Sequence, residues 1–203
     1  INESPESFLI RDKGYSIISC SPETLLLKKG DLIKTKPIAG TLRKTKKINH
    51  NKALAFFRRN EKETKEHNMI VDMERNDLSK ICKTGSVKID KLKTVEEYRD
   101  LFHYVTTIKG VLKNKITNHD IISSLMPGGS VIGCPKISTI QLLNQKEKSD
   151  RNIYTGSFGI IHSNGDMRFN IMIRTLLNFK NAIELSVASG VILGSTAKKE
   201  YNE

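Results

Sequence analysis

The sequence contains no tryptophan and only three cysteines among its 203 residues. Cys20, Cys82 and Cys134 are odd in number and widely spaced, a pattern typical of reduced thiols rather than of a disulfide framework or a zinc site. No apolar run approaches the roughly 18 residues that a membrane-spanning helix needs. No signal peptide is recognisable over residues 1–16, where charged residues interrupt the apolar ones. We therefore expect a cytoplasmic protein without a membrane partner.

Acidic residues are too few to balance the basic ones, since 34 Lys and Arg face 22 Asp and Glu, for a net charge of +12. The densest basic stretch, residues 34–52, has only Phe56 and Phe57 nearby, so it lacks the interleaved aromatic residues of a nucleic-acid stacking platform. We interpret the charge as a solvated, lysine-rich surface and expect no nucleic-acid partner. A basic, non-catalytic nucleic-acid-binding domain is a distant alternative, whose binding would weaken steeply with salt.

No repeat or Pro/Ser-rich linker divides the chain, which favours a single domain over residues 1–203. Alternating runs bounded by turn signals predict strands at residues 8–10, 15–19, 24–27, 32–35, 86–92, 153–162, 167–179 and 182–191. Helical spacing predicts helices at residues 52–59, 62–82, 95–109, 118–125, 135–145 and from 196 onward. Strands at both ends with helices between them indicate the α+β class.

Two pairs of glutamates have helical spacing. Glu63 and Glu66 lie three residues apart in the long predicted helix, and Glu200 and Glu203 have the same spacing in the last one. Residues three apart share a helix face, so two such pairs facing each other would form an oxygen-rich site of the kind that Mg²⁺ prefers. The same spacing is common on exposed helices, so spacing alone leaves both interpretations open.

The segment from Pro127 to Lys136 combines three glycines with the expected start of a helix. Free N–H groups at a helix start, with Lys136 beside them, form a natural anion site. The Gly-Lys-Ser/Thr ending of a Walker loop is absent, and a tight structural loop is the alternative.

Three further positions are ambiguous when taken singly. Arg174 interrupts an apolar run that we expect to be a strand, and a buried arginine needs a carboxylate partner from the protein or from a ligand. His103 lies on an apolar face of the predicted helix at 95–109, where a lone histidine is usually a core residue. Residues 36–41 read as a strand that ends at a Gly-Thr turn, with Glu23 upstream.

Together these segments resemble the chorismate-utilising enzymes, nearest to aminodeoxychorismate synthase component I, next to anthranilate synthase component I, and more distantly to isochorismate and salicylate synthases. The resemblance rests on SPETLL (21–26), KPIAGTLRK (36–44), EHNMIVDMERNDLSKICKTGSVKI (66–89), FHYVTTIKG (102–110), PGGSVIGCPK (127–136), NIYTGSFGIIHSNGDMRFNIMIRTL (152–176) and VASGVILGSTAKKEYNE (187–203). It implies antiparallel sheets packed as a sandwich with flanking helices. The family's catalytic module is longer, so we expect this chain to match its later part, without an N-terminal stretch and the end of the last helix, and to bind chorismate weakly or not at all.

The resemblance implies a metal site for Mg²⁺, which would bind the ring carboxylate of chorismate. Glu66 and Glu203 match the family's metal-coordinating glutamates, with Glu63 and Glu200 as companion acids.

The resemblance also implies how the rest of the substrate is held. Arg174 and Tyr154 would bind the enolpyruvyl carboxylate, helped by backbone amides around Ser189 and Gly190. Ser130 and Lys136 would line the same pocket.

Two residues match the family's catalytic groups. Glu23 matches the general acid that protonates the departing C4 hydroxyl, a role that needs a raised pKa, and His103 matches the histidine near that hydroxyl.

The product depends on how nitrogen enters. Aminodeoxychorismate synthases commonly carry a nucleophilic lysine where this chain has Ala39. The sequence KPIAGT resembles the corresponding motif of anthranilate synthases. Three other segments, PGGSVIGCPK, YTGSFG and FNIMIRT, resemble the aminodeoxychorismate group, so we predict a transferase of folate and para-aminobenzoate synthesis, with the anthranilate-forming lyase of the tryptophan pathway as the alternative. The sequence has no amidotransferase signature, so we expect a separate glutamine amidotransferase subunit to supply ammonia.

Overall fold

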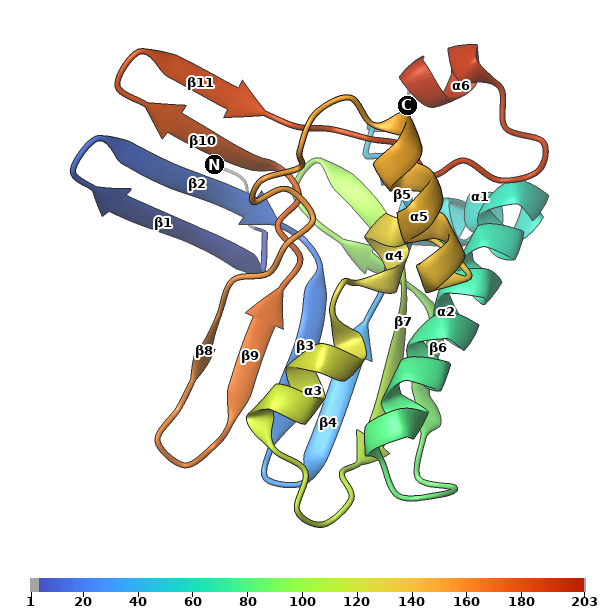
Figure 1. The fold of residues 1–203 in the computed structure, drawn as a ribbon. Coiled ribbons are helices and arrows are strands. Elements are labelled where there is room, and N and C mark those ends of the chain that lie inside the picture. Colours follow the sequence, from blue (N-terminus) through green and yellow to red (C-terminus); the bar gives the residue numbers. More distant parts are fainter. Residues whose placement is uncertain (1–3, 203) are drawn as a thin grey trace.

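The structure is a computed structural model that describes residues 4–202, apart from the side chain of Lys199, and its architecture is α+β (Figure 1). The smaller of two antiparallel sheets has the order β1 (Glu6–Asp12), β2 (Tyr15–Ser21), β10 (Thr175–Phe179) and β11 (Ala182–Leu185). The larger has the order β5 (Ile38–Arg43), β7 (Leu101–Val111), β4 (Leu32–Lys36), β3 (Thr24–Lys29), β9 (Met167–Asn170) and β8 (Gly159–Ile161), and β6 (Lys88–Glu97) pairs with β7. The helices are α1 (His50–Arg59), α2 (Glu61–Ile81), α3 (Asn118–Leu125), α4 (Gly129–Ile132), α5 (Lys136–Lys146) and α6 (Ala197–Asn202).

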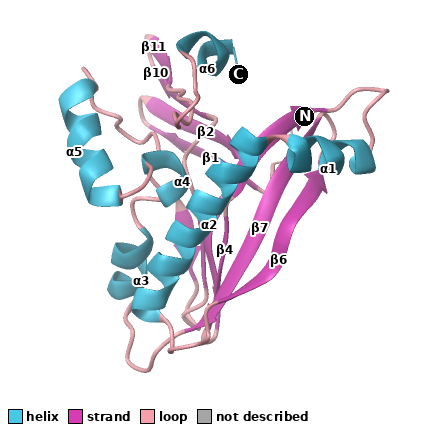
Figure 2. Cartoon of the chain, turned by 90° about the vertical axis from the view of Figure 1, so that its right-hand side faces the viewer, coloured by secondary structure: helices cyan, strands magenta, loops and turns pink. Residues whose placement is uncertain are grey.

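Helix α2 covers one face of the larger sheet, with α1 and α3 on the same side (Figure 2). It begins where the Asn60 side chain accepts a hydrogen bond from Glu63 N at 3.3 Å, a typical N-cap. Apolar residues at helical spacing then face the sheet, and the main core cluster joins Leu78 of α2 to Ile33 of β4 and Ile108 of β7. Burial of this apolar stripe fixes which side of α2 faces the sheet.

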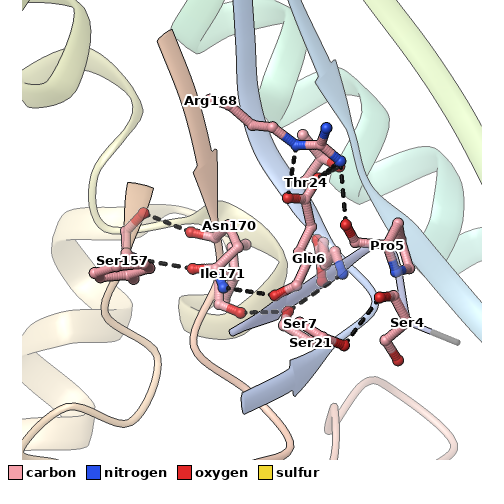
Figure 3. Close-up of polar contacts among 12 residues, drawn as sticks. Ser4, Pro5, Glu6, Ser7, Ser21, Thr24, Ser157, Arg168, Asn170 and Ile171 are labelled. Carbon is pink, nitrogen blue, oxygen red and sulfur yellow. Dashed lines mark hydrogen bonds and ion pairs between the residues drawn. The ribbon is translucent and has the colours of Figure 1, made fainter. Parts of the chain in front are cut away.

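The chain passes twice from one sheet to the other, and the two crossings lie side by side. The first, between β2 and β3, contains Glu23, and the second, residues 171–174 between β9 and β10, ends at Arg174. Ile171 N donates to the Glu23 carbonyl at 3.1 Å, Cys20 N donates to the Arg174 carbonyl at 3.1 Å, and Ser21 Oγ donates to the Ile171 carbonyl at 2.6 Å. The last of these bonds is visible in Figure 3. Main-chain bonds therefore hold the two crossings together.

A buried carboxylate ties the first strand of the small sheet to the large one (Figure 3). Glu6 of β1 accepts a hydrogen bond from Arg168 Nε of β9 at 2.9 Å and another from Thr24 Oγ1 of β3 at 2.5 Å. These two hydrogen bonds join β1 to β3 and to β9, so they attach the small sheet to the large one beside the crossings.

One predicted helix is wrong. Residues 95–109 form the end of β6 and most of β7, paired in antiparallel register from Lys88–Lys109 to Glu97–Phe102. The segment is rich in β-branched and aromatic residues, which favour strands, and β7 is buried on both faces, which removes the alternation that marks a strand. His103 therefore lies on a central strand of the sheet.

Other boundaries differ more locally. The predicted strand at 167–179 is interrupted between β9 and β10, so Arg174 lies outside a strand, and the predicted strands at 153–162 and 182–191 shrink to β8 and β11. The strand after Lys36 does not end at the Gly-Thr turn but continues to Arg43, with an irregular register between Ile38 and Thr41. Helix α5 forms as expected, yet its apolar side is uncovered and Ile137 is 75% exposed.

The remaining predictions are confirmed within a few residues: strands at 8–10, 15–19, 24–27, 32–35 and 86–92, and helices at 52–59, 62–82, 118–125 and from 196. Among residues 4–202, none of the helices is long and apolar enough to cross a membrane.

Candidate active site

Glu23 is a buried acid at the first crossing between the sheets. Only 4% of it is exposed, and Ser130 Oγ donates a hydrogen bond to its Oε1 at 2.6 Å. Burial raises the pKa of Glu23 from 4.5 to about 7, against the opposing influence of Ser130, the Ile38 backbone and the charge of Arg174. A raised pKa is the direction that a general acid requires.

Arg174 lies at the end of the second crossing, close enough to Glu23 for each charge to shift the other's pKa. Its backbone has a positive φ of 51°, a left-handed conformation that a non-glycine residue adopts only where the surrounding structure requires it. The residue is exposed overall, although loss of solvent around the guanidinium lowers its pKa. It makes no ion pair with a carboxylate of the described residues, so the protein partner considered in the sequence analysis is absent from this part of the chain.

His103 is buried on β7 and faces β5. Its Nδ1 lies 3.0 Å from Thr41 Oγ1, and burial followed by the positive charge of Arg174 lowers its pKa to about 4. The imidazole is therefore neutral at physiological pH. The shared influence of Arg174 places His103 and Glu23 in one electrostatic environment.

The glycine-rich segment approaches this environment from the helical side. Gly129 packs so closely on Met73 of α2 that an added Cβ would lie 2.3 Å from the methionine Cε, so a side chain at this position would displace Met73. The following residue is Ser130, which reaches Glu23. Lys136, at the start of α5, instead forms an ion pair with the buried Asp77 of α2, so its charge is already neutralised inside the protein.

Two carboxylates, Glu66 in the first turns of α2 and Glu200 of α6, lie against the loop at residues 186–195. An added Cβ on Gly190 would lie 2.6 Å from Glu66 Oε1. The neighbouring Ser189 donates from Oγ to Glu200 Oε2 at 2.6 Å, and Lys62 Nζ lies 2.6 Å from Glu200 Oε1. The hydrogen bond from Lys62, followed by that from Ser189, lowers the pKa of Glu200 to about 2. Glu66 and Glu200 thus approach the same dipeptide from two helices.

The donor chemistry of this carboxylate group suits Mg²⁺, which prefers carboxylate oxygens and water. Three of the four predicted ligands, Glu63, Glu66 and Glu200, lie in the described part of the chain, and Glu203 lies outside it. Within residues 4–202 no three acidic, histidine or cysteine side chains are close enough together to hold a metal ion as they stand. Glu200 is held instead by a lysine and a serine. The narrow space between Gly190 and Glu66 is nevertheless the kind of cradle that such a site needs.

Tyr154 lies beside the loop at residues 186–195. It lies in the turn before β8, with the Arg151 guanidinium carbon 5.9 Å from the ring centroid. The pKa of the phenol is raised above its usual value, because burial outweighs the opposing influence of Arg151 and of a backbone hydrogen bond from Ala188. The phenol therefore contacts the residue directly before Ser189 and Gly190.

Gly40 on β5 connects the acid group to the carboxylate group. Its backbone lies beside His103 and raises the histidine's pKa through a hydrogen bond, and an added Cβ would lie 2.7 Å from Glu63 Oε2. A positive φ of 107° also makes glycine the residue that this backbone accepts without strain. Since Glu63 and Glu66 are one helical turn apart, the contacts run continuously from His103 to Gly190.

Two buried acids of this region were missed from the sequence. Glu74 and Asp77 lie on the buried side of α2, below α4 and α5. The signal was present, because Glu74 lies four residues after Ile70 and four before Leu78, both of which belong to the predicted apolar stripe.

Comparison with known proteins gives this arrangement a family. A model of chorismate binding enzymes matches residues 1–203. The chain is 38% identical over 204 residues to "Aminodeoxychorismate synthase component 1" of Bacillus subtilis, covering 100% of this chain and 43% of that protein. The chain belongs to the chorismate binding enzyme family.

Other members of the chorismate binding enzyme family are almost as similar. "Anthranilate synthase component 1 1" of Haloarcula marismortui is 37% identical over 204 residues, covering 100% of this chain and 42% of that protein. Anthranilate synthase component I from Streptococcus pneumoniae superposes with a TM-score of 0.88 at 34% identity, covering 99% of this chain and 44% of that one. The fold is therefore that of anthranilate synthase component I, and the chain spans less than half the length of these relatives.

Proposed function

We propose that this chain carries the chemistry by which aminodeoxychorismate synthase component I replaces the C4 hydroxyl of chorismate with nitrogen from ammonia. In balance, chorismate and ammonia give 4-amino-4-deoxychorismate and water. The observation that supports it most directly is the pair of crossings between the sheets, which puts a buried acid, Glu23, within electrostatic range of Arg174, a cation without a described protein carboxylate.

Arg174 suits one end of a substrate that carries two carboxylates. A guanidinium binds a carboxylate through two parallel hydrogen bonds, and its partly desolvated surroundings strengthen that interaction. Tyr154 and the backbone near Ser189 lie on the same loop side and would complete the clamp for the enolpyruvyl carboxylate.

Glu23 suits the departing hydroxyl group. A carboxyl with a pKa of about 7 is partly protonated at neutral pH and can transfer its proton to the oxygen, which leaves as water. Neutral His103, bonded to Thr41 at 3.0 Å, would orient that hydroxyl without adding positive charge.

The carboxylates of α2 and α6 suit the ring carboxylate through a divalent cation. Glu66 and Glu200 would hold Mg²⁺, with Glu63 beside them and Glu203 beyond the described residues. When bound, the ion would supply Lewis-acid stabilisation of negative charge that develops on the substrate. Binding would require Glu200 to leave Lys62 or to share its oxygens, because both now accept hydrogen bonds.

The identity of the product is the finer part of the proposal. Ala39 is 3% exposed on β5 and provides no nucleophile, so a group that adds at ring C2 must come from solution. Direct addition of ammonia at C2, followed by loss of pyruvate, would give anthranilate, and Ala39 favours that alternative. The three segments that resemble aminodeoxychorismate synthases, PGGSVIGCPK, YTGSFG and FNIMIRT, support aminodeoxychorismate as the product, and we give them more weight than this one residue.

The ammonia would come from a glutamine amidotransferase subunit, as in the family's two-component enzymes. Free ammonia should replace that partner in the test tube at high concentration. The uncovered side of α5 and the neighbouring loops leave room for a protein partner on this part of the molecule.

The test is identification of products by mass spectrometry. The 203-residue chain, at concentrations comparable to substrate so that slow turnover is detected, is mixed with chorismate, ammonium and Mg²⁺, with the Bacillus subtilis relative as a positive control. Aminodeoxychorismate supports the proposal, whereas anthranilate supports the alternative. Absence of both products, while the relative is active, contradicts the proposed activity of this chain.

A binding measurement separates the enzyme from the basic-domain alternative. Chorismate titration by calorimetry with Mg²⁺ should give heat that is lost in Arg174→Met. Binding of nucleic acid that falls steeply with salt and is indifferent to chorismate would instead support the basic domain.

A further inference from the structure

A second buried acid, Glu74, follows Met73, against which Gly129 packs, and the residue after that glycine, Ser130, bonds to Glu23. Glu74 is 4% exposed, the same as Glu23, and comes from α2, whereas Glu23 comes from the crossing between β2 and β3. Neither carboxyl forms an ion pair with a basic side chain of residues 4–202. Two neighbouring carboxyls that are buried and held by no ion pair are expensive to ionise together.

The packing of the helices around Glu74 directs the nearby lysine to another acid. Helix α4 packs between α2 and α5 (Figure 2), and Lys136 at the start of α5 is the cation whose charge acts on Glu74. Its Nζ is engaged by Asp77, one turn after Glu74, and by the Leu125 carbonyl at 3.3 Å. Lys80 also lies 2.8 Å from Asp77, which therefore has two ion-pair partners, whereas Glu74 forms no ion pair with a basic side chain of the described residues.

The groups that act on Glu74 come from several parts of the fold. Glu23 comes from the crossing, Asp77 from α2 and Lys136 from α5, and Thr35 of β4 contributes a hydroxyl. Burial, then the negative charges of Glu23 and Asp77, raise the pKa of Glu74 to about 8, against the weaker opposing effects of Lys136 and Thr35. The directions agree with the geometry, because Glu74 becomes harder to ionise once Glu23 has lost its proton.

We propose that Glu23 and Glu74 hold one proton between them near neutral pH, and that Glu74 is a positioning residue which keeps Glu23 able to act as an acid. The second clause rests on the proposed function. In the reaction, Glu23 gives its proton to the departing hydroxyl, which leaves as water, and regains one from the ammonia nitrogen as that nitrogen bonds to carbon. Glu74 does not touch the substrate, and it extends the pH range over which the pair retains a proton to give.

The first test needs no substrate. Carboxyl ¹³C resonances of the labelled 203-residue chain are followed between pH 5 and pH 9. Two glutamates should titrate in this range, each in two phases, because each responds to the other. In Glu74→Gln one of them should disappear and the other should titrate in a single phase. Wild-type glutamates that all titrate near their ordinary values, below about pH 5, would overturn the proposal even if no variant folds.

The second test measures the consequence for catalysis. In Glu74→Gln the alkaline limb of kcat/KM should move down by about one pH unit, the interval between the pKa values of about 8 and about 7. Glu74→Asp should restore part of the shift, and Asp72→Asn, which removes an exposed carboxylate of the same helix, should leave the limb in place. An unmoved limb in Glu74→Gln, with a folded and active protein, would overturn the role of Glu74.

The two tests also distinguish this inference from the proposed function. A coupled titration in a chain that makes no product from chorismate would leave the proton pair intact and contradict the activity. Turnover of chorismate together with independent, ordinary titrations would do the reverse.

Discussion

The hydroxyl of Ser130 lies 2.6 Å from Oε1 of Glu23 and donates a hydrogen bond to it. The two residues are 107 positions apart in the sequence, one on α4 and the other between β2 and β3. This bond joins the glycine-rich segment to the crossing between the sheets, and it stabilises the charged form of a carboxyl that burial otherwise keeps neutral.

Ser130→Ala should therefore raise the pKa of Glu23 further above 7. A hydrogen bond to a charged group contributes about 1.5 kcal/mol or somewhat more, which corresponds to roughly one pH unit. The measurement is the ¹³C titration of Glu23, and Ser123→Ala on the exposed side of α3 is the control. A lower or unchanged pKa in Ser130→Ala would show that the bond does not stabilise the carboxylate.

The stability of the protein should fall as the pH rises through neutrality. Glu23 and Glu74 have folded-state pKa values of about 7 and about 8, above the ordinary glutamate value of 4.5, so the folded state holds their protons more tightly. Their contribution is complete below pH 4.5 and is lost as the pH rises through 7 and 8. Urea unfolding from pH 5 to pH 9 measures it.

Glu74→Gln should remove part of that slope and gain stability relative to the wild type at pH 9, whereas Asp72→Asn should keep the wild-type slope. If the wild type and Glu74→Gln lose stability in parallel, Glu74 is not the group that titrates.

Arg174→Met should raise the pKa of His103 from about 4 and that of Glu23 from about 7, because the positive charge of Arg174 lowers both. Two-dimensional NMR of the imidazole and carboxyl groups reports these shifts without substrate. Arg75→Met removes an exposed arginine of α2 and should change neither. Unshifted His103 and Glu23 in Arg174→Met would place the guanidinium too far away to act on the site.

Gly190→Ala should disturb Glu66 while leaving the fold intact. The added Cβ would lie 2.6 Å from Glu66 Oε1, and the end of a flexible side chain can move aside where backbone cannot. We expect weaker binding of Mg²⁺ by calorimetry, by roughly tenfold if one ligand is displaced, with an unchanged Tm. Val191→Ala, at the next and exposed position, is the control. Equal Mg²⁺ affinity in both variants would exclude Glu66 as a ligand.

Local sequence patterns predicted most of the fold where one face of an element meets solvent. Burial alternates along β1 and β4, and α2 has a clear apolar stripe, so the positions of these elements follow from periodicity alone. Strand β7 has solvent on neither face, so its run from Phe102 to Ile108 resembled a buried helix. Only the pairing of β7 with β4, β5 and β6 distinguishes the two structures, and pairing between distant segments is not written in local spacing.

The candidate site divides in the same way. Glu23, Arg174 and the α2 glutamates were recognisable from residue type and from the wording of their segments. Two other features depend on how α4 and α5 pack on α2. These are the ion pair that neutralises Lys136 with Asp77 and the burial of Glu74. Such tertiary pairs decide which charges remain available to a ligand, and no single segment contains them.

The two strand-to-strand passages that carry Glu23 and Arg174 bond to each other through their main chains. A hinge motion of the four-stranded sheet relative to the seven-stranded one would therefore carry the acid and the guanidinium along together. The distance between Glu23 and Arg174 should change little in such a motion, whereas the distance of both residues from the α2 carboxylates would vary.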